Sequence, residues 1–365
     1  MDPIERPGLE GVIAARTRLS RVDGERGELV IAGYRLDDLA GHVPFESLLH
    51  LLWNGALPDA GELDRLRGEL AAARELPERT VALLWDAAGD GVAPMDALRM
   101  GAASLGADGD DRAQALRVVA GLPTIVAVYA RLVAGEELVV PDPELGHAAN
   151  LLWCWTGRQP SAARVAALDA YLVTVSDHGL NASTFAARVV TSTGSGVVDA
   201  CTAAIGALKG PLHGGAPGPA LDMVREICTL DRAPAYLDAK LAAGERLMGF
   251  GHRIYRVRDP RADVLGAACQ RLFAAGEGDP ATWTLALGVE EIALAKLAAH
   301  RPERRLQTNV EFYTALLLDA LGLTPEWFTP VFAVGRAAGW TAHALEQRAA
   351  ARLIRPSSVY VGREP

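Results

Sequence analysis

The chain has 365 residues, with 45 acidic and 36 basic side chains and a formal net charge of -9 at pH 7. This acidic balance argues against a general nucleic-acid-binding surface, so any polyanionic ligand must meet a local basic patch. The length exceeds that of a typical single domain and predicts one large domain or two unequal ones.

The N-terminal segment, residues 1–7, shows no targeting signal. It lacks a charged stretch followed by an apolar one, and it is too acidic for a transit peptide. The most apolar stretch, residues 118–130, lies between two arginines, contains Pro123 and is too short to span a bilayer. We therefore expect a soluble cytoplasmic protein.

Residues 15–34 contain the only convincing β pattern in the chain. Apolar Leu19 and Val22 lead into Asp23-Gly24, and the apolar residues 29–31 follow directly. Two short apolar runs around such a turn predict a small β-hairpin.

The sequence after this hairpin shows the start and stop signals that are typical of helices. Apolar residues between Phe45 and Trp53 recur at helical spacing and stop at Gly55. The sequence predicts an all-α fold with about fifteen or more helices and one N-terminal hairpin. Cap and proline signals place further helix starts near residues 94, 142–143, 161, 259–260 and 324–325.

Two segments, residues 206–217 and 248–261, each set one histidine among glycines. His213 is followed by Gly-Gly, and His252 is preceded by Gly-Phe-Gly. Glycine removes bulk and lets the backbone approach a ligand, so both imidazoles should be accessible. A helix is predicted just past His213, and a helix N-terminus disfavours a neighbouring positive charge. His213 should therefore stay neutral and donate an N–H hydrogen bond, as in the polarisation of a carbonyl.

A third segment, residues 308–313, adds a carboxylate. Asn309 suits a helix N-cap, which places Glu311 in the first turn, where a carboxylate is favoured and should stay ionised. Two neutral imidazoles and one carboxylate suit proton abstraction next to a carbonyl. The carboxylate acts as the base, and each imidazole serves one developing oxyanion.

These three segments resemble those of the citrate synthases and, more widely, of the citrate/2-methylcitrate synthase family. The resemblance covers nearly the whole chain in the right order. Further similar segments are residues 8–12, 177–184, 335–340 and 355–356.

The resemblance implies an all-α fold of two domains. Residues 1–213 and 317–365 would form a large helical domain that dimerises and binds oxaloacetate, and residues 214–316 would form a small helical domain that binds CoA. Closure of the two domains would unite His213, His252 and Glu311 and exclude water.

The resemblance also implies catalytic roles for these three residues. His213 would donate to the thioester oxygen of an acyl-CoA, His252 would protonate the ketone oxygen of oxaloacetate, and Glu311 would remove the methyl proton. The family usually has aspartate at position 311. Glutamate adds one methylene, which shifts the carboxylate by up to roughly 1.5 Å.

The implied oxaloacetate ligands are His178, Asn181, Arg261, Arg336 and Arg355. Planar guanidinium groups bind carboxylates through paired hydrogen bonds, and a dicarboxylate needs at least two of them. Asn181 could instead simply cap a helix. Arg355 resembles the family arginine that reaches the neighbouring subunit's site, which implies an obligate homodimer.

For CoA, the resemblance points to the backbone of Leu247, Met248, Gly249 and Gly251 around the adenine. The basic cluster of Arg253, Arg256 and Arg258 could meet the phosphates. Residues 214–219 depart from the common family form, which carries Asn-Glu after Gly-Gly-Ala. We expect no metal and no permanently bound cofactor, with acetyl-CoA as co-substrate.

The predicted reaction is condensation of acetyl-CoA with oxaloacetate to give citrate and CoA. A 2-methylcitrate synthase that uses propionyl-CoA is a rival within the same class, because one methylene contributes only about 1–3 kcal/mol of discrimination. Two candidates from different classes are a catalytically weakened ligand-binding paralogue, suggested by Glu311, and a helical scaffold. The glycine-flanked histidines count against both of these.

Overall fold

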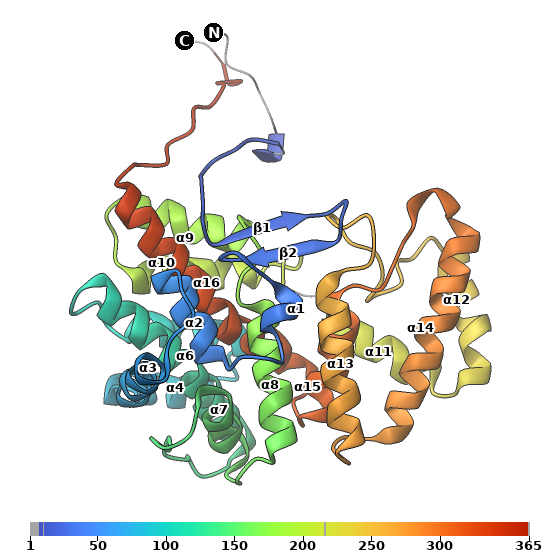
Figure 1. Ribbon diagram of the computed structural model, residues 1–365, viewed down its shortest axis with the longest axis horizontal. Helices are drawn as coiled ribbons and strands as arrows, with labels where there is room; N and C mark the ends of the chain where they lie inside the picture. The colour runs from blue at the N-terminus through green and yellow to red at the C-terminus, as the bar shows by residue number, and fades with distance from the viewer. Residues whose placement is uncertain (1–6, 10, 215–216, 364–365) are drawn as a thin grey trace.

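The computed structural model describes residues 7–9, 11–214 and 217–363 (Figure 1). These residues form sixteen α-helices and one small sheet, which confirms the all-α prediction. The helices are α1 (Leu36–Leu39), α2 (Phe45–Asn54), α3 (Ala60–Ala72), α4 (Glu78–Gly89), α5 (Pro94–Ser104), α6 (Asp111–Ala134), α7 (His147–Thr156), α8 (Ala162–Val175), α9 (Ala182–Ser192), α10 (Val197–Leu208), α11 (Pro217–Ile227), α12 (Ala233–Ala242), α13 (Pro260–Ala274), α14 (Pro280–His300), α15 (Val310–Ala320) and α16 (Phe328–Ala350). Short 3-10 turns are η1 (Pro7–Leu9), η2 (Leu230–Arg232), η3 (Pro302–Arg304) and η4 (Pro325–Trp327).

The predicted hairpin is present, and a third strand extends it. Strand β1 (Ser20–Asp23) pairs antiparallel with β2 (Glu28–Ile31), and Ser20 lies opposite Ile31. The added strand β3 (Tyr34–Arg35) pairs with β2 after a turn at Gly33, where φ is +96°. Two residues are too few to produce an alternating pattern, so β3 could not be predicted from the sequence.

Helix α6 runs through the centre of the helical body and corrects one prediction. The apolar stretch 118–130, which the sequence predicts to be too short to span a bilayer, is part of a longer helix of 24 residues that continues through Pro123. By length and composition α6 is long enough to cross a membrane, but 72% of its apolar window is buried inside the protein, as in a core helix. It packs against α4, α5, α7, α10 and α16.

Three predicted helix starts are confirmed by side-chain caps, and Pro94 begins α5 without one. Thr324-Pro325 instead opens the 3-10 turn η4, and α16 follows from Phe328. Ser161, Asp259 and Asn309 each accept a backbone N–H from the first turn of α8, α13 and α15. The start predicted at residues 142–143 is wrong. Asp142 accepts the backbone N–H of Glu144 at 2.9 Å, and this Asx turn competes with helix formation. The next helix, α7, therefore begins only at His147.

Helix α16 lies directly against the end of α8, because two glycines remove the side chains between them. A Cβ atom on Gly339 would stand 2.3 Å from the carbonyl oxygen of Ser176, and one on Gly335 would stand 2.6 Å from Val175. The backbone N–H of Gly339 donates to that Ser176 oxygen at 3.1 Å. This contact fixes Arg336 of α16 beside the segment that follows α8.

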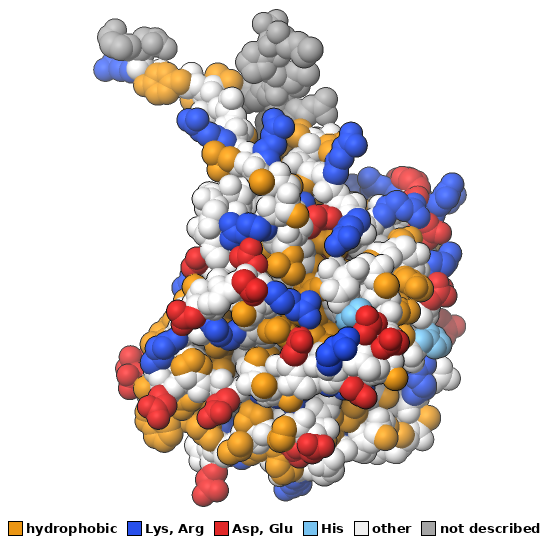
Figure 2. Space-filling view, turned by 60° about the vertical axis from the view of Figure 1, so that its left-hand side comes forward, with side chains coloured by type: hydrophobic (Ala, Val, Ile, Leu, Met, Phe, Trp, Pro, Cys, Tyr) orange, Lys and Arg blue, Asp and Glu red, His pale blue; other side chains and the backbone are white. Residues whose placement is uncertain are grey.

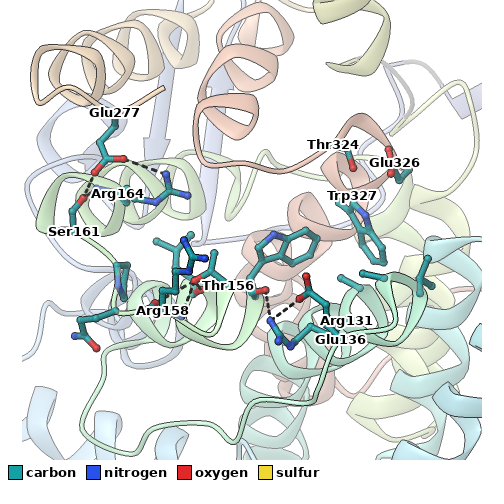
Figure 3. Close-up of a pocket in the computed structure, with 17 residues that line it drawn as sticks. Arg131, Glu136, Thr156, Arg158, Ser161, Arg164, Glu277, Thr324, Glu326 and Trp327 are labelled. Atoms are coloured by element: carbon teal, nitrogen blue, oxygen red, sulfur yellow. Dashed lines mark hydrogen bonds and ion pairs between the residues drawn. The ribbon is translucent and has the colours of Figure 1, made fainter. Parts of the chain in front are cut away.

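Helices α8 and α13 form an antiparallel pair in the middle of the molecule (Figure 1). At one end, His178 follows α8 and Arg261 lies in the first turn of α13. At the other end, Glu277 accepts from the Ser161 hydroxyl at 2.6 Å and from Arg164 Nη1 at 3.2 Å (Figure 3). A stable α8–α13 pair therefore contributes to the geometry of the His178–Arg261 end.

Helices α11, α12 and α14 lie together on one side of the molecule, beyond α13 and α15 (Figure 1). Helix α12 packs on α14, and α11 packs on both α14 and α15. The division into residues 1–213 with 317–365 and residues 214–316 stays a prediction.

The contact at the far end of α8 and α13 should contribute to stability. The hydrogen bond from Ser161, followed by the effect of Arg164, lowers the pKa of Glu277, so its carboxylate stabilises the fold above the carboxyl's ordinary pKa and less as pH falls. At pH 7, E277Q should lower the free energy of unfolding by about 1 kcal/mol. Urea denaturation at pH 7 and pH 4 measures this, with exposed Glu75→Gln as the control. Equal stability of both variants at pH 7 would refute the assignment.

Candidate active site

His213 lies in the turn between α10 and α11 and is held by Ser183. Its Nε2 lies 3.3 Å from the backbone N–H of Ser183 and 2.8 Å from the Ser183 hydroxyl. Trp340 of α16 donates its indole N–H to the same hydroxyl at 3.1 Å. Because a backbone N–H can only donate, Nε2 acts as an acceptor, and the ring proton is assigned to Nδ1. The Nδ1–H is then available to a ligand oxygen.

The pKa of His213 is lowered to about 4, so the ring is neutral near pH 7. Burial is the main cause, followed by the positive charge of Arg336. The sequence predicted a neutral ring from the helix N-terminus that follows. That helix, α11, is present, but Gly215 and Ala216 at its start lie outside the described residues.

His252 has the opposite tautomer. Its Nδ1 accepts the backbone N–H groups of Ile254 at 3.0 Å and Tyr255 at 3.1 Å, so the proton is assigned to Nε2. That Nε2 lies 3.1 Å from Nη2 of Arg261, which is also a donor. Two donors that face each other suit an acceptor oxygen of a ligand. Burial and then Arg261 lower the pKa of His252 to about 4.

His178 joins these groups into one cluster. It is buried, its Nε2 lies 3.1 Å from the Tyr255 hydroxyl, and its ring centroid lies 5.9 Å from that of His252. Burial lowers the pKa of His178 well below its usual range, and Arg261, Arg336, His252 and His213 add to this effect. The three imidazoles and two guanidinium groups thus share one electrostatic environment.

Glu311 lies in the first turn of α15, and Asn309 is the N-cap that accepts its backbone N–H at 2.9 Å. The prediction that the helix N-terminus keeps this carboxylate ionised is wrong. Burial raises the pKa of Glu311 to about 7 and outweighs the opposing effects of Arg261 and Arg336. Removal from water destabilises the charged carboxylate by more than the helix N-terminus stabilises it.

Arg261 is fixed by Asp259, two residues before it. Its Nε and Nη2 donate to the two Asp259 oxygens at 3.0 and 2.8 Å, and only 5% of Arg261 is exposed. Although burial alone would lower its pKa, the Asp259 carboxylate raises it overall. Asp259 also accepts the backbone N–H of Val310 at 3.2 Å, which ties this pair to the start of α15 beside Glu311.

Arg336 is also buried, but fewer protein groups offset its charge than offset that of Arg261. Its Nε donates to the carbonyl of Val175 at 2.6 Å, and its guanidinium stands 4.7 Å from the ring of Phe332. Within the described parts of the chain it forms no ion pair. Burial, together with the charge of Arg261, lowers the pKa of Arg336 to about 10, although nearby carboxylates oppose this. A ligand carboxylate would supply the missing partner.

Two predicted oxaloacetate ligands are placed differently. Asn181 caps α9: its oxygen accepts from the Thr184 N–H at 3.1 Å, and its amide donates to the Thr184 hydroxyl and the Gly179 carbonyl. The structure thus shows Asn181 as a helix cap. Arg355 is exposed on the tail after α16, which leaves the body of the molecule (Figure 1). Figure 2 shows further basic side chains near the root of the two terminal segments.

The predicted CoA segment, residues 247–251, pairs with the strand-like residues 307–309. Gly251 donates its N–H to Gln307 at 2.7 Å, and Asn309 donates to the carbonyls of Gly249 at 2.9 Å and Gly251 at 2.7 Å. Both glycines have positive φ, of +86° and +80°. These bonds use part of the backbone expected to meet adenine and hold the His252 loop against the start of α15. Leu247 is buried, and Met248 is partly buried against the hydrophobic core.

A cleft of about 590 Å³ opens beside His252 and Tyr255. Arg253 and Arg256 line it as the sequence suggested, whereas Arg258 does not line it and forms ion pairs with Asp263 and Glu290. The sequence analysis missed two further basic residues of its wall, Arg304 and Arg305, although they form a basic run shortly before Glu311.

Another cavity, of about 770 Å³, lies at the far end of α8 and contains none of the predicted site residues (Figure 3). Sequence reasoning also missed Ser183, Tyr255 and Asp259. The sequence predicted Asp259 only as a helix cap. Ser183 lies in the family-like segment 177–184, but the sequence predicted no role for it.

Comparison with known proteins gives a consistent result. The family model described as "Citrate synthase, C-terminal domain" matches residues 8–357. Citrate synthase of Haloferax volcanii is 41% identical over 97% of this chain and 95% of its own length. The 2-methylcitrate synthase of Mycobacterium tuberculosis is 39% identical over 99% and 92%.

Solved structures agree with this result. Citrate synthase from Pyrobaculum aerophilum has a TM-score of 0.91 at 36% identity, covering 99% of this chain and 95% of that one. Citrate synthase from Thermoplasma acidophilum, in a ternary complex with carboxymethyl coenzyme A and oxaloacetate, has a TM-score of 0.89 at 27% identity, covering 98% and 96%. With its glycine-flanked histidines and buried arginines on such a helical frame, this chain belongs to the citrate synthase family.

Proposed function

We propose that this protein is an acyltransferase that condenses acetyl-CoA with oxaloacetate to form citrate and CoA. The observation that carries the proposal is one cluster of neutral imidazoles, buried guanidinium groups and a carboxyl whose pKa lies near 7. A base with a pKa close to the working pH and two N–H donors suit enolisation of a thioester.

Oxaloacetate is the ligand that the cluster fits best. Its two carboxylates supply partners for Arg336 and for the free side of Arg261, and His178 adds a polar contact. Its ketone oxygen fits between the Nε2–H of His252 and Nη2 of Arg261, two donors that otherwise face each other. The ligand would thus pair the buried charge of Arg336 and place an acceptor between the facing donors of His252 and Arg261.

The chemical steps follow from the assigned tautomers. The Glu311 carboxylate removes a methyl proton from acetyl-CoA while the Nδ1–H of His213 donates to the thioester oxygen, which gives the enol. The enol carbon attacks the ketone carbon of oxaloacetate, whose oxygen takes the proton of His252. Water then hydrolyses the citryl thioester and releases CoA. Arg253, Arg256, Arg304 and Arg305 offer positive charge to the CoA phosphates.

A homodimer is supported by the terminal segments. The tail that carries Arg355 exposes Val359, Tyr360 and Val361 by 61%, 69% and 92%, and the N-terminal segment exposes Ile13 by 87%. The two segments lie on the same side of the molecule (Figure 1). Apolar residues gathered on extended segments favour contact with a second copy of this chain, which would bring Arg355 to the partner's site.

The function is tested by oxaloacetate-dependent release of free CoA thiol, with acetyl-CoA and propionyl-CoA assayed in parallel. We expect release with acetyl-CoA, a lower kcat/KM with propionyl-CoA, and none when oxaloacetate is omitted. Higher kcat/KM with propionyl-CoA would assign the 2-methylcitrate reaction. Oxaloacetate binding without thiol release from either substrate would identify a non-catalytic paralogue and refute the proposal.

Glu311 should set the pH dependence of the reaction. Since only its deprotonated form accepts a proton, kcat/KM should rise with pH and level off above an apparent pKa near 7. The histidines cannot cause this rise, because their pKa values lie near 4. E311Q should lower kcat by at least about 100-fold without unfolding, as circular dichroism would show. A flat profile between pH 6 and 8 would contradict the role of Glu311.

The role of Arg355 can be tested by complementation between subunits. R355A and H252A should each be nearly inactive alone. If Arg355 serves the partner's site, a refolded equimolar mixture should recover about a quarter of wild-type activity, since half the dimers are mixed and each has one complete site. If Arg355 serves its own chain's site, mixing should restore nothing.

A further inference from the structure

A buried carboxylate that the proposed reaction does not use lies behind the site. Glu290, in the middle of α14, is only 7% exposed. A buried carboxylate is costly unless hydrogen-bond donors surround it. Its donors therefore show what the residue holds in place.

Three side chains from two separate segments donate to Glu290. One of its carboxylate oxygens accepts from the Thr308 hydroxyl and from Nη1 of Arg258, the latter at 3.1 Å. The other oxygen accepts from the Tyr313 hydroxyl. Thr308 is almost fully buried, and Tyr313 is buried as well.

Each donor stands next to a group of the candidate site. Thr308 precedes the cap residue Asn309, and Tyr313 follows Glu311 by two residues on α15. Arg258 precedes Asp259, the carboxylate that fixes Arg261. One side chain thus joins the segment that carries the base to the segment that carries a guanidinium group.

Among the residues that the structure describes, Glu290 is not one of those that line the cleft beside His252. Exposed Glu291, its neighbour on α14, belongs to none of these contacts. The network therefore acts through the residues it ties together.

We propose that Glu290 is a positioning residue, which sets the place of the Glu311 carboxyl relative to Arg261 through Thr308, Tyr313 and Arg258. The inference rests on the proposed function, because it assigns Glu311 as the base. A displacement of about 1 Å at a reacting group can cost on the order of 100-fold in rate. Loss of the network should therefore appear in kcat.

The test compares E290Q with E291Q by the thiol-release assay. Glutamine keeps the size of the side chain, but its NH2 group cannot accept one of the three hydrogen bonds. We expect kcat of E290Q to fall by about 10- to 100-fold, with that of E291Q near wild type. T308V should lower kcat by a smaller factor, and T308S, which keeps the hydroxyl, should restore most of it.

A double variant separates positioning from a merely structural role. If Glu290 acts through Glu311, adding E290Q to E311Q should lower the residual rate by less than about twofold. Losses that multiply would refute the inference, as would an E290Q kcat within twofold of E291Q. If E290Q does not fold, the comparison of T308V with T308S decides the question, and equal kcat values for these two variants would overturn the inference. Wild-type protein without oxaloacetate-dependent activity would instead refute the proposed function.

Discussion

Two buried guanidinium groups, those of Arg261 and Arg336, set the electrostatics of the candidate site. Each lowers or raises the pKa of groups around it, and together they disfavour protonation of the nearby histidines. Arg261 has the carboxylate of Asp259, whereas Arg336 relies on a backbone carbonyl and an aromatic ring. The cluster is therefore ready for a dianion, and burial, assisted by the same positive charge, keeps the imidazoles available as neutral donors.

Glu311 experiences two opposing effects. The guanidinium groups favour its charged form, while removal from water favours its neutral form by a larger amount. A carboxylate held at this balance point is more basic than an exposed one and can still lose its proton near neutrality. The extra methylene of glutamate is thus accompanied by an environment that makes the group a stronger base.

Local patterns were enough to predict the helical class, the hairpin and the caps at Ser161, Asp259 and Asn309. They also singled out His213, His252 and Glu311 by their glycine and cap contexts. The raised pKa of Glu311 could not be predicted, because burial is produced by segments distant in the chain. The ion pair of Asp259 with Arg261 and the hydrogen bond of Ser183 with His213 could not be predicted for the same reason, because a cap signal does not show which side chain lies opposite.

The missing side chains at Gly335 and Gly339 have a consequence for the tolerance of the site to change. At Gly335 and Gly339, helix α16 lies so close to Val175 and Ser176 at the end of α8 that an added methyl group has no room. Even alanine at position 339 would wedge the two helices apart and would redirect Arg336 and His178 together. The placement of two proposed oxaloacetate ligands thus depends on backbone spacing at positions that leave no room for a side chain, as well as on the polar groups themselves.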